Sequence, residues 1–225
     1  MGLHRGAAHD QVPAQEGAAV SIALWIVASY VLGATPTSYI AGRLGRGIDL
    51  REHGSKNLGA TNVYRILGWR YAIPVALFDI AKGAIPILLY TRWSMAAQQL
   101  WQPWIPVALG GAAVLGHMFS PYVNFKGGKG VATAAGVFLV LAPLAFAIAI
   151  PVWALCLWLT GYVSLSSIVA ALTFPVWVRL TTDAGPAFWA SVVLALLIAI
   201  AHWRNIKRLL AGTESKFRTR GQVPT

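Results

Sequence analysis

A stretch at residues 124–133, NFKGGKGVAT, combines two cations with a glycine-rich backbone. Its cations are Lys126 and Lys129, and its glycines are Gly127, Gly128 and Gly130. Glycines allow backbone N–H groups to turn toward a ligand, and a helix that begins near Gly130 would add the positive end of its dipole. With the Lys129 ammonium, such a loop could cradle a phosphate, although it lacks the Ser or Thr that follows the lysine of a Walker A loop. The alternative is a turn whose lysines attract lipid phosphates.

A second polar stretch, GSKNLGATN at residues 54–62, is a dense run of small hydrogen-bonding residues. Such a run can build an anion-binding nest of backbone N–H groups, and Ser55, Asn57 and Asn62 are its candidate substrate-binding side chains. Ser55 or Asn57 could equally cap a short helix that runs to Leu67. The capping and binding interpretations are compatible with each other.

Two further polar groups lie in apolar segments. Ser164, Ser166 and Ser167 cluster at the start of one such segment, where serine can cap a helix, pack between helices or contact a substrate. Asp79 and Lys82 are three residues apart inside another. Because charges inside a membrane are costly and usually paired, these two are predicted to form a structural ion pair, with a role near the site as the second interpretation.

The segment AHWRNIKRLLAGTE, residues 201–214, carries a histidine and an asparagine that could do chemistry. His202 and Asn205 are three residues apart and therefore share one face of a helix. His202 is either a structural hydrogen-bonding group or a general base. The histidines and carboxylates of the chain share no ligand spacing, so no metal site is predicted.

The composition is that of an integral membrane protein. Of the 225 residues, 57% are hydrophobic and 11% are charged, whereas soluble domains carry about 25% charged residues. The ten Trp residues fit the membrane–water interface. The net charge of +11 is assigned to cytoplasmic loops that face anionic headgroups, so no nucleic-acid binding is predicted. The single cysteine, Cys156, indicates nothing about the redox compartment.

The expected fold is all-α: a bundle of seven transmembrane helices. The seven apolar segments are roughly 19–42, 70–91, 101–122, 129–142, 144–161, 165–181 and 186–206. A span needs about 20 apolar residues. The fourth and fifth segments are shorter and are separated by Pro143, so they form either two spans with a tight turn or one kinked helix.

Three parts of the chain are distinguished by composition. Residues 1–17 are short, polar and Gly/Ala-rich, and are predicted to be a disordered tail. Residues 18–210 form a single membrane domain without an internal repeat, and residues 211–225 form a basic cytoplasmic C-terminal tail. With seven spans, most of the 18 basic residues fall on one face, which places the N-terminus outside and the C-terminus in the cytoplasm. All the polar loop clusters then share the cytoplasmic face, where they suit an anionic phosphorylated substrate and a lipid co-substrate.

Four motifs in order resemble those of a known family. They are GSKNLGATN at 54–62, GHMFSPYVNFKGGKGVAT at 116–133, GYVSLSSI at 161–168 and HWRNIKRLLAGTE at 202–214. In these motifs, the sequence is similar to the bacterial acyl-phosphate-dependent glycerol-3-phosphate acyltransferases, the PlsY family. Two departures affect local geometry: Lys56 stands where glycine is common, and Ser120 stands where phenylalanine is usual.

The resemblance implies a reaction and a set of residues. Acyl phosphate and sn-glycerol 3-phosphate would give 1-acyl-sn-glycerol 3-phosphate and phosphate, the first acylation of phospholipid synthesis. The implied catalytic residues are His202, Asn205, Ser55 and Lys129. Substrate and phosphate binding would involve Arg65, Gly127, Gly128, Lys129, Gly130, Ser164, Ser167, Asn57 and Asn62, with Ser166 as an alternative serine. The proton acceptor is either His202 or a substrate phosphate.

The resemblance also implies the setting of the reaction. The protein would lie in the bacterial plasma (inner) membrane with its active site on the cytoplasmic side, without cofactor or metal. Its partners would be glycerol 3-phosphate, acyl phosphate, membrane lipids and, transiently, the enzyme that makes acyl phosphate. An organophosphate transporter is the rival hypothesis, but it would place polar residues at mid-membrane in two repeats. A lipid-binding scaffold would explain the basic loops but not the Ser/Asn/His group.

Overall fold

The structure, a computed structural model, describes residues 11–96, 102–183 and 185–217, and in these residues it is helical without strands. Ten α-helices and one 3-10 helix follow one another along this part of the chain. They are α1 (Gln11–Ala34), α2 (Thr37–Arg46), α3 (Ala60–Leu67), α4 (Trp69–Ala96), α5 (Trp104–Met118), η1 (Pro121–Val123), α6 (Val131–Leu141), α7 (Pro143–Thr160), α8 (Val163–Thr181), α9 (Pro186–Ala201) and α10 (Trp203–Leu210).

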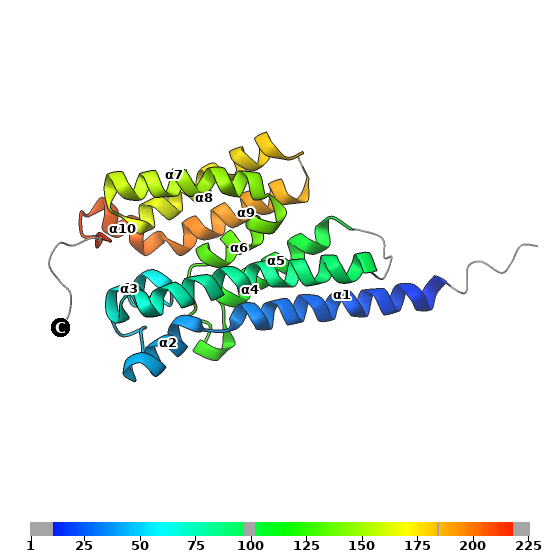
Figure 1. Ribbon diagram of the computed structural model, residues 1–225, viewed down its shortest axis with the longest axis horizontal. Helices are drawn as coiled ribbons and strands as arrows, with labels where there is room; N and C mark the ends of the chain where they lie inside the picture. The colour runs from blue at the N-terminus through cyan, green and yellow to red at the C-terminus, as the bar shows by residue number, and fades with distance from the viewer. Residues whose placement is uncertain (1–10, 97–101, 184, 218–225) are drawn as a thin grey trace, which may run out of the picture.

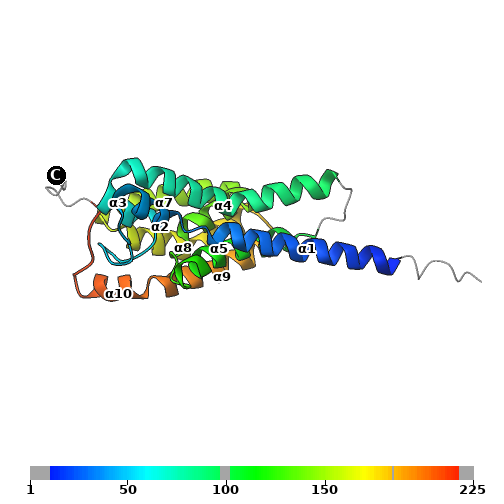
Figure 2. The ribbon, with the colours of Figure 1, turned by 90° about the horizontal axis from the view of Figure 1, so that it is seen from below.

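The long helices form two groups with α6 between them (Figure 1). In one group α1 and α4 pack against α5, and in the other α7 and α9 pack against α8. Helix α6 packs closely on α4, and its Phe138 ring lies 4.6 Å from the ring of Phe174 in α8. The short helices α2, α3 and α10 gather at one end of the bundle in both views (Figures 1 and 2). This end is where the polar motifs lie.

The surface and the helix lengths are those of a membrane protein. Large apolar side chains such as Leu77, Trp158 and Leu180 are exposed, as expected for a surface that faces lipid rather than water. Four segments are long and apolar enough to span a bilayer, and α9 with α10 makes a fifth if this pair, bent by 57°, counts as one span. Each of the seven predicted apolar segments contains a helix. The number of seven crossings and the orientation of the termini stay predictions.

Several boundaries differ from those predicted. Helix α1 begins at Gln11, so residues 11–17 of the predicted tail are helical, and residues 1–10 lie outside the described residues. Pro13 permits this start because it falls in the first turn, where backbone N–H groups have no intrahelical partner. The helices α6 and α7 are separate elements, since Ala142 interrupts them and Pro143 opens α7.

The first apolar segment is broken at Thr35 and Pro36, between α1 and α2. Pro36 has no N–H to donate, so the break leaves carbonyl groups of α1 to be satisfied by other elements. Ser120 Oγ donates to the Ala34 carbonyl at 2.5 Å, and Lys82 Nζ donates to the Thr35 carbonyl at 3.0 Å. The predicted ion pair is confirmed, because Lys82 Nζ also lies 2.7 Å from a carboxylate oxygen of Asp79. This buried pair fixes the break to α4.

Candidate functional site

The loop that carries Ser55 is shaped by Asn62, the first-turn residue of α3. The Asn62 amide oxygen accepts the Ser55 N–H at 2.8 Å, and its amide nitrogen donates to the Leu50 and His53 carbonyls, each at 3.1 Å. Asn62 is buried, and both of its amide hydrogens are used by the loop backbone. Asn62 therefore has a structural role in this loop, and its contact with substrate stays a prediction.

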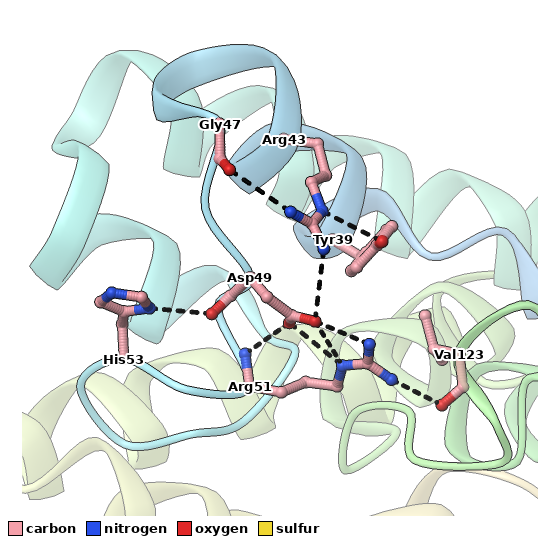
Figure 3. A network of polar contacts seen from close by, with 7 residues as sticks. All are labelled: Tyr39, Arg43, Gly47, Asp49, Arg51, His53 and Val123. Atoms are coloured by element: carbon pink, nitrogen blue, oxygen red, sulfur yellow. Dashed lines mark hydrogen bonds and ion pairs between the residues drawn. The ribbon is translucent and has the colours of Figure 1, made fainter.

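An ion-pair network ties this loop to the next one (Figure 3). Arg51 forms a bidentate pair with Asp49, with its closest contact at 2.7 Å, and donates to the Val123 carbonyl at 3.0 Å. The hydrogen bonds from Arg51 hold the pKa of Asp49 below its usual range. Arg43 adds a contact of 3.8 Å to the same carboxylate. Because Val123 belongs to η1, which leads into the glycine-rich stretch, the network holds the two motif loops together.

The glycines at 127 and 128 are required for close packing. The Gly127 N–H donates to the Met118 carbonyl and the Gly128 N–H to the His117 carbonyl, each at 3.1 Å. A Cβ on Gly127 would lie 2.0 Å from the His117 carbonyl oxygen, and one on Gly128 would lie 2.1 Å from His117 Nε2. The predicted phosphate cradle therefore does not use these two N–H groups, because the end of α5 already accepts them.

Gly130 and the start of α6 keep the predicted geometry. Gly130 precedes the helix with a φ of 83°, a left-handed conformation that favours glycine. Helix α6 begins at Val131, so its N-terminal dipole end lies directly beside Lys129. This part of the stretch can still favour an anion.

Lys129 enters a hydrogen-bonded cluster built by α8, α10 and the residues after α10. Lys129 Nζ donates to the Asn205 amide oxygen at 2.5 Å, and the Asn205 amide nitrogen donates to Glu214 Oε1 at 2.6 Å. Ser164 Oγ donates to the same Glu214 oxygen at 2.7 Å, while Arg208 Nε donates to Oε2 at 2.6 Å. One carboxylate thus organises side chains from three predicted motifs.

Glu214 and its partner Arg208 are cluster residues that the sequence did not single out. Burial alone would raise the pKa of Glu214, but hydrogen bonds from Ser164, Arg208 and Asn205 outweigh it and leave the pKa below its usual value. The carboxylate therefore stays charged near neutral pH. The signal available in the sequence was its position at the end of the fourth motif, in a region where the other charges are basic.

Two cations of the site lie partly out of water. Burial lowers the pKa of Lys129 to about 8, with Arg208 and Arg65 acting in the same direction and Glu214 against them. Burial also lowers the pKa of Arg65, whose guanidinium donates to the Ser215 carbonyl at 3.1 Å. Arg65 and Lys129 are within electrostatic reach of each other although they come from different parts of the fold. Two neighbouring cations of this kind favour an anionic ligand.

His202 sits between α9 and α10 and is buried. Its Nδ1 is 2.8 Å from the Ile198 carbonyl, and because a carbonyl only accepts, Nδ1 carries the hydrogen. The lone pair is then on Nε2, which is the ring nitrogen able to accept a proton. Lys129 is close enough for its charge to act on the ring.

The structure separates the three serines of the third motif. Ser164 belongs to the Glu214 cluster, whereas Ser166 Oγ donates to the Tyr162 carbonyl and Ser167 Oγ accepts from Trp153 Nε1 at 3.3 Å. Ser55 and Asn57 are half-buried on the first loop. The cluster therefore joins Lys129, Asn205, Ser164 and the neighbouring Arg65. Within the described ranges, no group of three or more His, Cys, Asp and Glu side chains is placed to hold a metal ion.

The described residues thus form an all-helical bundle of the integral-membrane kind, with a basic cluster that contains serine and asparagine at one end. The comparisons identify its family. The family model described as glycerol-3-phosphate acyltransferase matches residues 23–212. The chain therefore belongs to the glycerol-3-phosphate acyltransferase family, and it is an acyltransferase of the PlsY type.

Individual relatives agree with this assignment. The chain is 41% identical to a glycerol-3-phosphate acyltransferase of Fusobacterium nucleatum subsp. nucleatum over 194 residues, covering 86% of this chain and 97% of the relative. It is 44% identical to one of Trichlorobacter lovleyi, covering 86% and 96%. It also superimposes on the crystal structure of PlsY, an integral membrane glycerol 3-phosphate acyltransferase in its glycerol 3-phosphate form, with a TM-score of 0.81 and 36% identity, covering 88% and 96%.

Proposed function

We propose that the protein transfers an acyl group from acyl phosphate to the sn-1 hydroxyl of glycerol 3-phosphate. The products are 1-acyl-sn-glycerol 3-phosphate, a lysophosphatidic acid, and inorganic phosphate. Solved structures of a similar PlsY are described as a glycerol 3-phosphate form and a lysophosphatidic acid form, which supports the acceptor and the product.

The observation that carries the proposal is the charge imbalance of the site. Three cations, Arg65, Lys129 and Arg208, surround the single carboxylate of Glu214. Because Arg65 and Lys129 are partly withdrawn from water, their excess charge is best neutralised by ligand phosphates. Two phosphorylated substrates, one of them a lipid, suit such a site at the end of an apolar bundle.

The chemistry needs mainly positioning, since an acyl phosphate is already activated. The glycerol hydroxyl oxygen attacks the acyl carbon and forms the new C–O bond. The bond from that carbon to the phosphate oxygen breaks, and phosphate leaves with the electron pair. The hydroxyl proton goes either to His202 Nε2 or to a substrate phosphate, and no covalent acyl-enzyme forms.

The proposed role of each residue follows from the chemistry of its side chain. Arg65 and Lys129 hold phosphate groups, and the N-terminal end of α6 after Gly130 adds its dipole. Asn205 and Ser164 supply hydrogen bonds from the Glu214 cluster. Ser55 and Asn57 contribute from the first loop, which the Arg51 pair holds against η1. No metal or cofactor takes part in this proposal.

The membrane arrangement is part of the proposal. Residues 18–210 would form one domain of seven crossings with the N-terminus outside, and the site would face the cytoplasm of a bacterial inner membrane. The apolar helices and the basic loops around the site support this orientation. Membrane lipids surround the domain, and the enzyme that makes acyl phosphate is a transient partner.

A direct assay tests the donor and the acceptor. Purified protein given palmitoyl phosphate and glycerol 3-phosphate should form lysophosphatidic acid without added metal. Palmitoyl-CoA in place of palmitoyl phosphate should give no product, and product from the thioester alone would overturn the donor assignment. The rate should rise with pH as the proton acceptor loses its own proton. If His202→Ala no longer shows this rise, His202 is the proton acceptor. If the rise is unchanged, that role belongs to a substrate phosphate.

A further inference from the structure

After α10 the chain turns at residues 211–212 and crosses the site as a strap without helix or strand, defined here as residues 211–217. The strap leaves α10 at one side of the bundle end and runs to α3 (Figure 2). Its middle holds Glu214 and Ser215, which contact Asn205 and Arg65 respectively. The strap is thus part of the site, and what fixes its far end decides where these contacts lie.

The far end is fixed by an aromatic pair and a backbone hydrogen bond. The rings of Phe217 and Tyr64 stack with centroids 4.8 Å apart and an interplanar angle of 24°. The Phe217 N–H donates to the Gly161 carbonyl at 2.7 Å, and Lys216 Nζ lies 5.5 Å from the centre of the Tyr162 ring. Phe217 is therefore attached both to α3 and to the residues that precede α8.

These attachments join two parts of the fold that pack on different neighbours. Helix α3, which carries Tyr64 and Arg65, packs against α2 and α4. Helix α10, which carries Asn205, packs against α8 and α9. The position of Arg65 relative to the Asn205 cluster consequently depends on the strap. Tyr64 adjoins Arg65 in sequence, so the aromatic pair acts on the helix turn that carries the guanidinium.

We propose that Tyr64 and Phe217 are positioning residues that form a clasp, which holds Arg65 at the correct distance from Lys129 for both cations to engage phosphorylated substrate. This inference rests on the proposed function for its substrate. Neither aromatic ring is assigned a contact with the reacting atoms. The clasp acts through Arg65 and Glu214, and it should therefore affect substrate affinity more than the chemical step.

The test compares Phe217→Ala and Tyr64→Ala with the wild-type protein. An aromatic pair contributes about 1 kcal/mol beyond burial, so each variant should raise the KM for glycerol 3-phosphate by about five- to tenfold with little change in kcat. Phe217→Tyr and Tyr64→Phe keep the stack and should restore the wild-type KM. The double alanine variant should be no worse than either single variant, because each alone removes the same pair.

The control is Trp69→Ala, which removes an exposed aromatic ring close to α3 but outside the clasp. It should leave the KM unchanged. An unchanged KM in Phe217→Ala, an equal rise in Trp69→Ala, or no rescue by Phe217→Tyr would each overturn the clasp. Binding of glycerol 3-phosphate without acyl donor, measured by calorimetry, tests the clasp separately from the reaction. If the wild-type protein binds glycerol 3-phosphate but makes no product, the proposed reaction is refuted. The clasp is then still tested by comparing the affinity of the variants for glycerol 3-phosphate with that of the wild type.

Discussion

Lys129 donates a hydrogen bond of 2.5 Å to the amide oxygen of Asn205, and this contact joins the glycine-rich stretch before α6 to α10. The two residues are 76 positions apart in the chain. Asn205 in turn donates to Glu214, so the lysine is linked to a carboxylate through an amide rather than by a direct ion pair. Its ammonium is held in place while its charge remains available to a ligand.

Lys129→Ala should reduce turnover by a factor of about 100 to 1000, the usual effect of removing one group that stabilises charge in a transition state. The bundle should stay folded, because Lys129 lies in a loop and its side chain is half-buried. Turnover of purified variant is measured with palmitoyl phosphate and glycerol 3-phosphate. Lys126→Ala, which changes an exposed lysine of the same stretch, is the matched control and should remain active. Near-normal turnover in Lys129→Ala would remove this residue from the site.

Substrate affinity should fall as the pH rises through about 8. Burial holds the pKa of Lys129 near that value, against 10.5 for an ordinary lysine, so the folded protein loses this charge first. Glycerol 3-phosphate is already fully charged there, because the second pKa of a phosphate monoester is about 6. The KM should be measured from about pH 6.5 to 9.5. Lys129→Arg keeps its charge throughout this range, and the same rise in KM in that variant would assign the effect to another group.

The sign of the corresponding stability change follows from the same pKa. Between about 8 and 10.5 the unfolded chain binds the Lys129 proton more tightly than the folded protein does. The contribution of Lys129 to the free energy of unfolding should therefore increase with pH in this window. Comparison of wild type with Lys129→Arg in thermal unfolding at both ends of the window isolates this contribution.

Gly128→Ala should inactivate the protein through geometry. The added Cβ would meet His117 Nε2 at 2.1 Å and the Leu58 carbonyl oxygen at 2.5 Å, so the loop that carries Lys129 must move. We expect a loss of turnover of at least tenfold, since displacement of a positioning group by about 1 Å can cost 100-fold. Gly111→Ala is the control, because a Cβ there meets no atom within 4 Å. Equal activity of the two variants would contradict the packing role.

Glu214→Gln should destabilise the protein as well as reduce its activity. The change removes the charge that Arg208, Asn205 and Ser164 share, and breaking one partner of such a buried cluster costs about 3 kcal/mol. Thermal unfolding in detergent should show a lower midpoint than wild type. Glu52→Gln, at an exposed carboxylate in the first loop, should leave the midpoint unchanged. A similar decrease in both variants would indicate a general charge effect.

Much of the site was predictable because its residue types are conspicuous in an apolar chain. Lys129, His202, Asn205 and Ser164 are polar groups next to long hydrophobic segments, and the helical face that joins His202 to Asn205 follows from their spacing. Arg65 came from the family resemblance. The structure adds how these groups meet.

The parts that could not be predicted depend on contacts between distant segments. Glu214 looked like one charge in a basic tail, because its role appears only when the strap folds back onto α8 and α10. Asn62 resembled a ligand, yet its amide is used by the loop that it shapes. Gly127 and Gly128 indicated free N–H groups, but the carbonyls at the end of α5 accept them.

In the fold, too, features that depend on the local sequence were predicted, whereas features that depend on contacts between distant segments were not. Hydropathy located the long apolar helices of the described residues. A helix that crosses a bilayer satisfies its backbone hydrogen bonds internally and presents apolar side chains to the lipid, which leaves a long apolar run in the sequence. It did not locate the break at Pro36 inside the first segment. Lys82 of α4 and Ser120, which directly precedes η1, stabilise this break. Hydropathy also missed the first turns of α1, which begins at Gln11 rather than near Ala18.

The strap has a consequence for how the protein matures. Chains are synthesised from the N-terminus, and the membrane helices can begin to pack before the last segment exists. Ser215 and Phe217 join the site only once translation has passed them, although Arg65 was made 150 residues before Ser215. A chain still being made thus carries Arg65 and Lys129, the cations proposed to bind phosphate, before the proposed clasp can form. With the proposed clasp, the capacity to hold substrate is completed last, by a short segment that follows α10.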